Sequence, residues 1–352
     1  MIIITNSRSI SRSYGQLHGG CPEGSDIRRL GVRSLFVFLF AGVILASAAS
    51  ASTPGCPDCP DWNNFNAWWD RYHKAPNQGD FGSSSGSLRD QAEKSRAKTE
   101  NSEISKVEYP NSEIVFRPDG GLDGCILLDA RSPADYEKGH LPGARNLYWR
   151  WLRPAGTLDI DVAVPLLSSL GIEETDSIVV YGVGDDSAYL FWALEVLGHP
   201  NLARLEGDFR ALNGLDLVQN APEAEESEYT PAFRKGLLVD ETMLKEGHGS
   251  PGVQIVDARP SYPDRAASRI SNSMYFKTAD LYSDPEAGTL KAARELERLF
   301  TGRGIDEEKV QMIYGTPEAT ALYFALRTMG YRATVVDGDW WQKTDYMVSS
   351  IS

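Results

Sequence analysis

The stretch "CILLDARSPADYEKGHLPGARNLYW" (residues 125–149) has a counterpart in "VQIVDARPSYPDRAASRISNSMYFK" (residues 253–277). Each is an apolar run that ends in Asp-Ala-Arg, followed by a polar helical pattern and a short second apolar run. A second pair of segments, residues 178–213 and 310–342, also matches: an apolar run ends in Tyr-Gly and a helical pattern follows. The chain is therefore predicted to contain two tandem copies of one α/β unit.

Short apolar strands that alternate with helices predict a parallel sheet covered on both faces. We expect an α/β fold with two domains, each a mostly parallel five-stranded sheet with helices on both faces, plus an N-terminal extension. A chain of 352 residues is long enough for two such domains, each with its own core. The predicted boundaries are residues 104–219 for the first domain, 220–235 for an acidic linker and 236–352 for the second domain.

The first 51 residues have the pattern of a secretory signal peptide. Three arginines precede the apolar stretch "LFVFLFAGVILASAA" (residues 35–49), and Ala49-Ser50-Ala51 offers a cleavage site between small residues. An uncleaved membrane anchor is the alternative, although the apolar stretch is short for a span. We expect export to the periplasm or the cell surface, with the membrane involved only through this signal or an anchor.

Residues 52–103 contain a cysteine pair, an aromatic segment and a linker. Cys56 and Cys59 form "CPDC", for which a local disulfide, a redox-active pair, half of a metal site or a lipid anchor on Cys56 are open alternatives. The segment "DWNNFNAWWDRYHK" (residues 61–74) predicts a helix with an aromatic face, either docked on the next domain or free for binding. The Gly- and Ser-rich residues 77–87 and the polar residues after them predict a linker.

The overall charge narrows the classes of partner. The chain has 49 acidic and 35 basic residues, a net charge of −14, which argues against binding to nucleic acid. No pattern indicates a cofactor, and no Cys or His cluster has the spacing of a metal site. We expect a monomer that binds an unidentified small ligand or protein partner.

Two loops are the candidate binding sites because each lies between an apolar strand and a helix start. Amides of such a loop and of the first helical turn point into one small space, which suits an anion or a covalent intermediate. The first loop (residues 182–187) and the second loop (residues 315–320) comprise Gly182, Val183, Gly184, Asp185, Asp186, Ser187, Gly315, Thr316, Pro317, Glu318, Ala319 and Thr320.

At these positions the chain resembles the rhodanese (thiosulfate sulfurtransferase) family, in its tandem-domain form. "LLDARSPADYEKGHLPGARNL" (residues 127–147) is similar to the first signature of that family, and the two loops with their helices are similar to the second. The resemblance covers both repeats, about 240 residues, and none of residues 1–103. It implies a catalytic cysteine directly after the strand's Tyr, whose thiolate carries a persulfide. Here Gly182 and Gly315 correspond to that position, and neither can be a nucleophile.

The other loop residues favour loss of the activity. The first loop has two acids and the second has one, and neither contains a base, so a bound anion would meet about 1 to 4 kcal/mol of repulsion per pair. Ser187 and Thr320 have no recognisable His base, and we expect each hydroxyl to cap the helix that follows.

Several further residues are expected to be structural. Asp129 with Arg131, and Asp257 with Arg259, are predicted to form ion pairs at the ends of the first strands. The resemblance implies that His140, in Gly-His-Leu-Pro-Gly, is a packing and turn position. Cys125 opens a buried strand and is expected to be inert.

Two main functions follow as hypotheses. The first is an exported tandem rhodanese-like protein that lacks turnover and acts as a binding or accessory module. The alternative is a sulfurtransferase that uses Cys56 or Cys59 as the sulfur carrier. A third class, electron transfer or metal handling by the CPDC segment and the aromatic helix, remains open.

Overall fold

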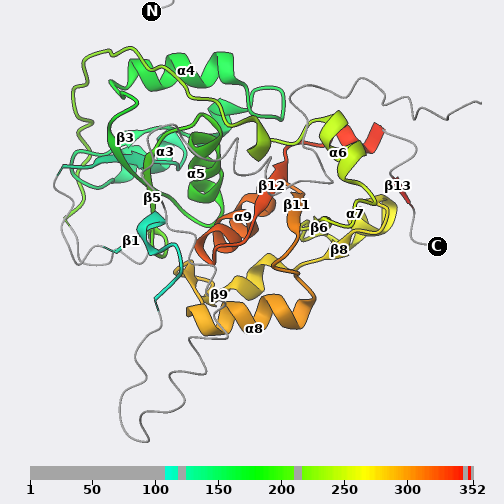
Figure 1. Ribbon diagram of the computed structural model, residues 1–352. Helices are drawn as coiled ribbons and strands as arrows, with labels where there is room; N and C mark the ends of the chain where they lie inside the picture. The colour runs from blue at the N-terminus through cyan, green and yellow to red at the C-terminus, as the bar shows by residue number, and fades with distance from the viewer. Residues whose placement is uncertain (1–107, 118–123, 210–215, 344–347, 350–352) are drawn as a thin grey trace, which may run out of the picture. The chain divides into compact units, whose positions relative to one another are not determined.

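The computed structural model describes residues 108–117, 124–209, 216–343 and 348–349 (Figure 1). The predicted signal segment, Cys56, Cys59, the aromatic helix and the linker after it lie outside these residues. Among the helices that are described, none has the length and apolar character needed to cross a bilayer.

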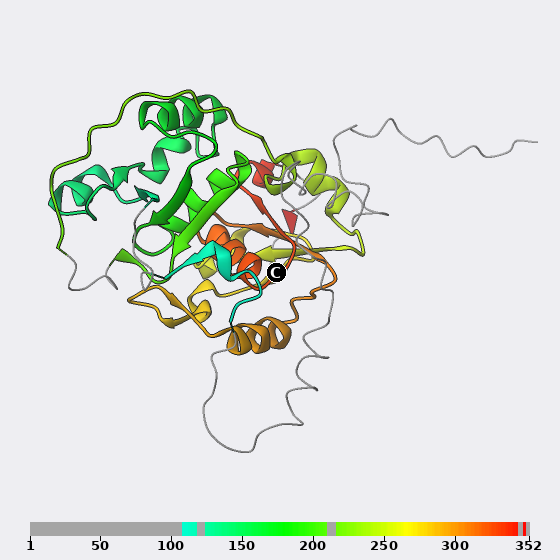
Figure 2. The ribbon, with the colours of Figure 1, turned by 60° about the vertical axis from the view of Figure 1, so that its left-hand side comes forward.

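The first sheet has five parallel strands in the order β1-β5-β4-β2-β3, as expected for the first domain. Figure 2 shows β4 and β5 (green) running side by side. The strands are β1 (Val115–Phe116), β2 (Ile126–Asp129), β3 (Arg145–Asn146), β4 (Ser177–Tyr181) and β5 (Asn201–Leu205). The helices of this half are η1 (Ser112–Ile114), α3 (Pro133–Lys138), η3 (Trp149–Leu152), α4 (Ile160–Ser169) and α5 (Asp186–Val196).

The second sheet has four parallel strands, in the order β12-β11-β6-β8. They are β6 (Val253–Asp257), β8 (Met274–Tyr275), β11 (Val310–Tyr314) and β12 (Ala333–Val336). The expectation of five strands is wrong here: the outer position beside β12 holds only an isolated parallel bridge from Leu238 to Val335. The 3-10 helix η5 (Lys235–Leu237) and the start of α6 leave too short an extended segment for a strand.

Helices and two small antiparallel pairs complete the second half. The helices are α6 (Glu241–Gly247), α7 (Tyr262–Ala267), η6 (Thr278–Leu281), α8 (Ala293–Arg303), α9 (Glu318–Thr328) and η7 (Trp340–Lys343). β9 (Tyr282–Asp284) pairs with β10 (Thr289–Leu290), and β7 (Arg269–Ile270) pairs with β13 (Val348–Ser349).

Both sheets bury both faces. Successive residues of β4 alternate between two core clusters: Ile178 and Val180 belong to one, and Val179 and Tyr181 to the other. This alternation is the period of two that a strand imposes on its side chains. It explains why these strands read as continuous apolar runs in the sequence.

Each half has a core cluster of its own, and the two halves also share a third, larger one. A single cluster of buried residues includes side chains from α5 of the first half and α9 of the second. Phe191 and Phe324 meet there edge to face, with ring centroids 5.0 Å apart. Every residue of α5 from Ser187 to Val196 is buried, so this helix has no solvent face.

Candidate functional site

The first loop joins β4 to α5 and is closed by groups from both halves. Asp185 is the N-cap residue of α5, but its side chain makes no capping hydrogen bond. Its carboxylate instead accepts a 3.4 Å hydrogen bond from the hydroxyl of Tyr282, at the start of β9. The side chain therefore lies between the two halves rather than over the helix end.

The first loop itself contains no base, but a base from a neighbouring strand lies against it. Arg204, on β5, is 2% exposed, and its Nε donates to Ser187 Oγ at 2.8 Å. Its Nη2 donates to the carbonyl of Gly184 at 3.4 Å, and its guanidinium lies 4.8 Å from the ring centroid of Phe324. The base is thus present but fully occupied by the loop that it supports.

Burial changes the charge of the loop acids. It raises the pKa of Asp185 against the attraction of Arg204, and it raises the pKa of Asp186 to about 6. Burial also raises the pKa of Glu318 in the second loop, and the charge of Asp185 adds to that increase. Desolvation disfavours the charged form of a carboxyl group. Near pH 6 Asp186 is therefore partly neutral, and its repulsion of an anion is weaker there than a full charge would give.

The second loop joins β11 to α9 and begins at a glycine with a left-handed backbone. Gly315 has φ +97°, and a Cβ placed on it would lie 2.5 Å from Cγ and 3.0 Å from the main-chain nitrogen of Arg259. Gly182 in the first loop is different, because a Cβ there would lie 3.2 to 3.3 Å from its nearest neighbours. A side chain fits tightly at Gly182 and does not fit at Gly315.

The second loop contains no base of its own, but a base from the first half reaches it. Arg153 Nη2 donates to Thr316 Oγ1 at 3.3 Å and to Asp337 Oδ1 at 3.2 Å. Asp337 follows β12, and its other oxygen accepts from the amide of Leu158 at 2.6 Å and from the hydroxyl of Tyr189 at 2.9 Å. The carboxylate of Asp337 thus takes up the positive charge beside the second loop.

Ser187 and Thr320 do not cap their helices. Ser187 lies inside α5 and accepts its hydrogen bond from Arg204. Thr320 lies inside α9 and donates 2.7 Å to the carbonyl of Pro317. The N-cap positions are Asp185 and Pro317, two residues before Ser187 and three residues before Thr320. Both hydroxyls are buried and have structural partners.

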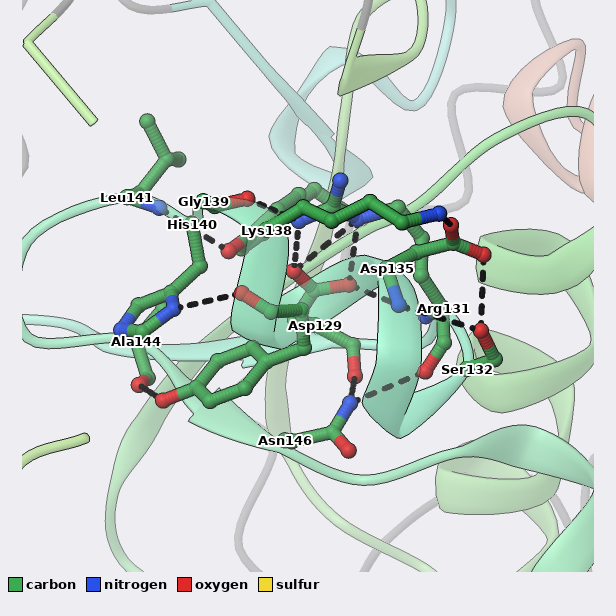
Figure 3. Close-up of polar contacts among 12 residues, drawn as sticks. Asp129, Arg131, Ser132, Asp135, Lys138, Gly139, His140, Leu141, Ala144 and Asn146 are labelled. Atoms are coloured by element: carbon green, nitrogen blue, oxygen red, sulfur yellow. Dashed lines mark hydrogen bonds and ion pairs between the residues drawn. The ribbon is translucent and has the colours of Figure 1, made fainter. Parts of the chain in front are cut away.

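The predicted ion pairs at the strand ends are both present. Arg131 Nη2 lies 2.6 Å from Asp129 Oδ2, and Arg259 Nη2 lies 2.7 Å from Asp257 Oδ2. Figure 3 shows Arg131 beside Asp129, with Asn146 bonded to the backbone of this turn. Arg131 also donates to the carbonyl of Gly139 at 2.8 Å, so the pair ties the end of β2 to the end of α3.

His140 is a packing residue in the structure. It is fully buried, and its ring stacks on Tyr136 with centroids 3.6 Å apart. Nδ1 lies 2.9 Å from the carbonyl of Tyr136, one turn earlier, and Nε2 lies 3.3 Å from the carbonyl of Asn220. Both ring nitrogens face main-chain carbonyls inside the fold, and a neutral ring donates to one of them, as expected of a buried packing residue.

Cys125 lies at the wrong edge of the sheet for either loop. It precedes β2, which is parallel to β4 with Ile126 beside Ile178. Gly182 follows the other end of β4, so at about 3.3 Å per residue the two positions are more than about 13 Å apart along the strands. No group of three His, Cys, Asp or Glu residues in the described part of the chain is arranged to hold a metal ion.

The residues missed by sequence reasoning are Arg153, Arg204 and Asp337. An Arg inside the apolar segment "NLARL" (residues 201–205) was a usable signal, because a charged residue in a buried strand requires a partner. Arg153 and Asp337 are separated by 184 positions, and nothing local in either segment indicates the other.

Comparisons with known proteins support the resemblance. Residues 118–214 match the rhodanese-like domain family. The chain is 26% identical over 253 residues to "Sulfur carrier protein TtuD" of Thermus thermophilus, covering 62% of this chain and 85% of that protein. It is 24% identical over 258 residues to 3-mercaptopyruvate sulfurtransferase of Escherichia coli, covering 66% and 89% respectively.

A solved structure shares the fold. SseA from Escherichia coli, described as a 3-mercaptopyruvate sulfotransferase with the rhodanese fold, superposes with a TM-score of 0.56 at 23% identity, covering 62% of this chain and 93% of SseA. Residues 118–214 are therefore similar to the rhodanese-like domain family, and the sequence relatives of the chain are named as a sulfurtransferase and a sulfur carrier protein.

Proposed function

We propose that this protein is an exported tandem rhodanese-like protein that has lost sulfurtransferase turnover and serves as a binding or accessory module. The observation that carries the proposal is the geometry at Gly315. A sulfur-carrying thiol there would need a Cβ only 2.5 Å from Arg259 Cγ, on a backbone at φ +97°. Real side chains do not tolerate such a contact, and L-residues rarely adopt this φ.

Arg259 cannot move aside cheaply to admit a side chain. Its guanidinium is paired with Asp257 at 2.7 Å and donates to the carbonyl of Ser268 at 2.7 Å. Breaking a buried ion pair costs about 3 to 5 kcal/mol. The second loop is therefore built around a glycine and not around a reactive thiol.

The charges around both loops agree with this reading. The bases beside the loops, Arg204 and Arg153, are held by Ser187 and Asp337, and acids occupy each loop. Cys125, the free cysteine of the described residues, lies at the opposite edge of its sheet. We infer that the loops accept a ligand that forms hydrogen bonds without a full negative charge, or a protein partner.

The test is a sulfurtransferase assay on the purified protein with thiosulfate and cyanide. We expect no thiocyanate above the blank for the native chain and for a Cys56→Ser/Cys59→Ser variant. Turnover that survives this double substitution would overturn the proposal. Turnover that it abolishes would establish the alternative in which the CPDC pair carries the sulfur. N-terminal sequencing of secreted or envelope protein, expected to start after Ala51, tests export separately.

A further inference from the structure

Three donors of the first half converge on one carboxylate of the second. Asp337 Oδ1 lies 3.2 Å from Arg153 Nη2, and Oδ2 accepts from the Leu158 amide at 2.6 Å and from the Tyr189 hydroxyl at 2.9 Å. The side chain of Asp337 is fully buried. A guanidinium, a hydroxyl and a main-chain amide around one anionic group form a typical receptor for a carboxylate or another oxyanion.

Two of the three donors, Arg153 and Tyr189, are held in place by contacts of the first half itself. The guanidinium of Arg153 lies 5.6 Å from the ring centroid of Trp149 and 5.2 Å from that of Tyr189, and it also donates to the carbonyl of Gly156. The ring of Tyr189 packs against Trp149 at 4.9 Å and Trp192 at 5.4 Å. None of these contacts involves Asp337, so these two side-chain donors are positioned without it.

We infer that Arg153, Tyr189 and the amide of Leu158 form an oxyanion-binding site of the first half, and that Asp337 of the second half is its built-in occupant. The site excludes free oxyanions from the edge of the second loop because the internal carboxylate already fills it. Removing the side chain of Asp337 then creates a site for a small free carboxylate. The inference does not rest on the loss of sulfurtransferase activity, since its test measures folding and binding.

The experiment is chemical rescue of an Asp337→Ala variant of the full chain by formate. Thermal melts are compared in 100 mM sodium formate and 100 mM sodium chloride at the same pH. For a formate dissociation constant of about 10 mM, 100 mM formate raises the folded-to-unfolded ratio about tenfold. Formate titration by calorimetry gives the same constant directly.

Two controls separate a receptor from a general salt effect. Asp339→Ala removes an exposed carboxylate two residues further on, and we expect it to respond to formate no more than the native chain does. The double variant Arg153→Ala/Asp337→Ala lacks the guanidinium, and we expect it to lose the rescue.

The outcomes are distinct. Rescue of Asp337→Ala that disappears with Arg153 supports the inference. An equal response of Asp337→Ala and the native chain, or rescue that persists without Arg153, overturns it. If Asp337→Ala is unfolded in chloride, it is refolded from urea into each salt: folding in formate alone supports the inference, and failure in both overturns it.

Discussion

The buried ion pair between α5 and α9 gives the sharpest prediction of stability. The carboxylate of Glu195 accepts from the hydroxyl of Tyr323 at 2.6 Å and from Arg327 Nη2 at 3.0 Å, and Arg234 Nη1 lies 3.9 Å away. The exposed fractions of the side chains of Glu195 and Arg327 are 7% and 23%. Glu195→Ala leaves the largely buried Arg327 without its counter-charge between α5 and α9.

The expected loss follows from the cost of an unpaired buried charge. Removing one partner of a buried ion pair costs about 3 to 5 kcal/mol in the free energy of unfolding. At about 2 to 4 °C per kcal/mol for a chain of this size, the melting temperature falls by about 6 to 20 °C. Urea unfolding and calorimetry measure both quantities, and the exposed Glu173→Ala on the same half is the matched control.

The pH dependence provides an independent check. Burial alone would raise the pKa of Glu195. The charge of Arg327 and the hydrogen bonds that Glu195 accepts from Arg327 and Tyr323 outweigh burial and lower that pKa overall. A lowered pKa in the folded state contributes stability above the unfolded pKa of about 4.3, and that stability is lost as the pH falls through the folded value. Glu195→Gln is therefore expected to flatten the decline of stability below about pH 4.

A double-mutant cycle decides whether the pair itself is responsible. Glu195→Ala/Arg327→Ala removes both members of the pair, and only the longer contact of Arg234 with Glu195 is lost in addition, so its cost should fall short of the sum of the single costs by about 1 to 3 kcal/mol. A loss below about 1 kcal/mol for Glu195→Ala, or strictly additive single costs, would refute the reasoning.

Two further predictions concern the loops. Gly315→Ala should lower the free energy of unfolding by about 2 to 4 kcal/mol, because of the left-handed φ at this position and the contact of the new Cβ with Arg259. Gly182→Ala should lower it by less than about 1 kcal/mol. Equal losses for the two variants in urea unfolding would contradict the geometry. Burial raises the pKa of Asp186 to about 6, so its charge costs stability increasingly as the pH rises from about 4 through 6. Asp186→Asn should therefore stabilise the protein by about 1 to 2 kcal/mol at pH 8, after allowance for partial exposure, and by nothing at pH 4. An equal change in melting temperature at both pH values would argue against this.

Local patterns predicted the parts of the fold that depend on neighbouring residues. Asp129 and Arg131 are two positions apart, so the turn after β2 brings them together wherever the strand packs. The side chains of β4 point alternately into two core clusters, and this alternation likewise follows from the strand geometry alone. The parallel order of the first sheet follows from strands joined by helices.

Long-range pairings could not be predicted in this way. Arg153 meets Asp337 only because the two halves pack together, and the distance between them in the sequence carries no signal. Leu238 forms a bridge and not a strand because a 3-10 helix and a helix start compete for the same few residues. The acids of the loops were visible in the sequence, whereas the bases that face them come from β5 and from the segment after η3.

The burial of α5 on all sides has a consequence for how this chain can change. Two domains joined by a linker can often be separated and still fold. Here separation of the two halves within residues 220–235 would remove the contact of α5 with α9 and expose Phe191 to water. The two halves are therefore expected to fold and to be degraded together, and a destabilising substitution in either half is expected to destabilise both.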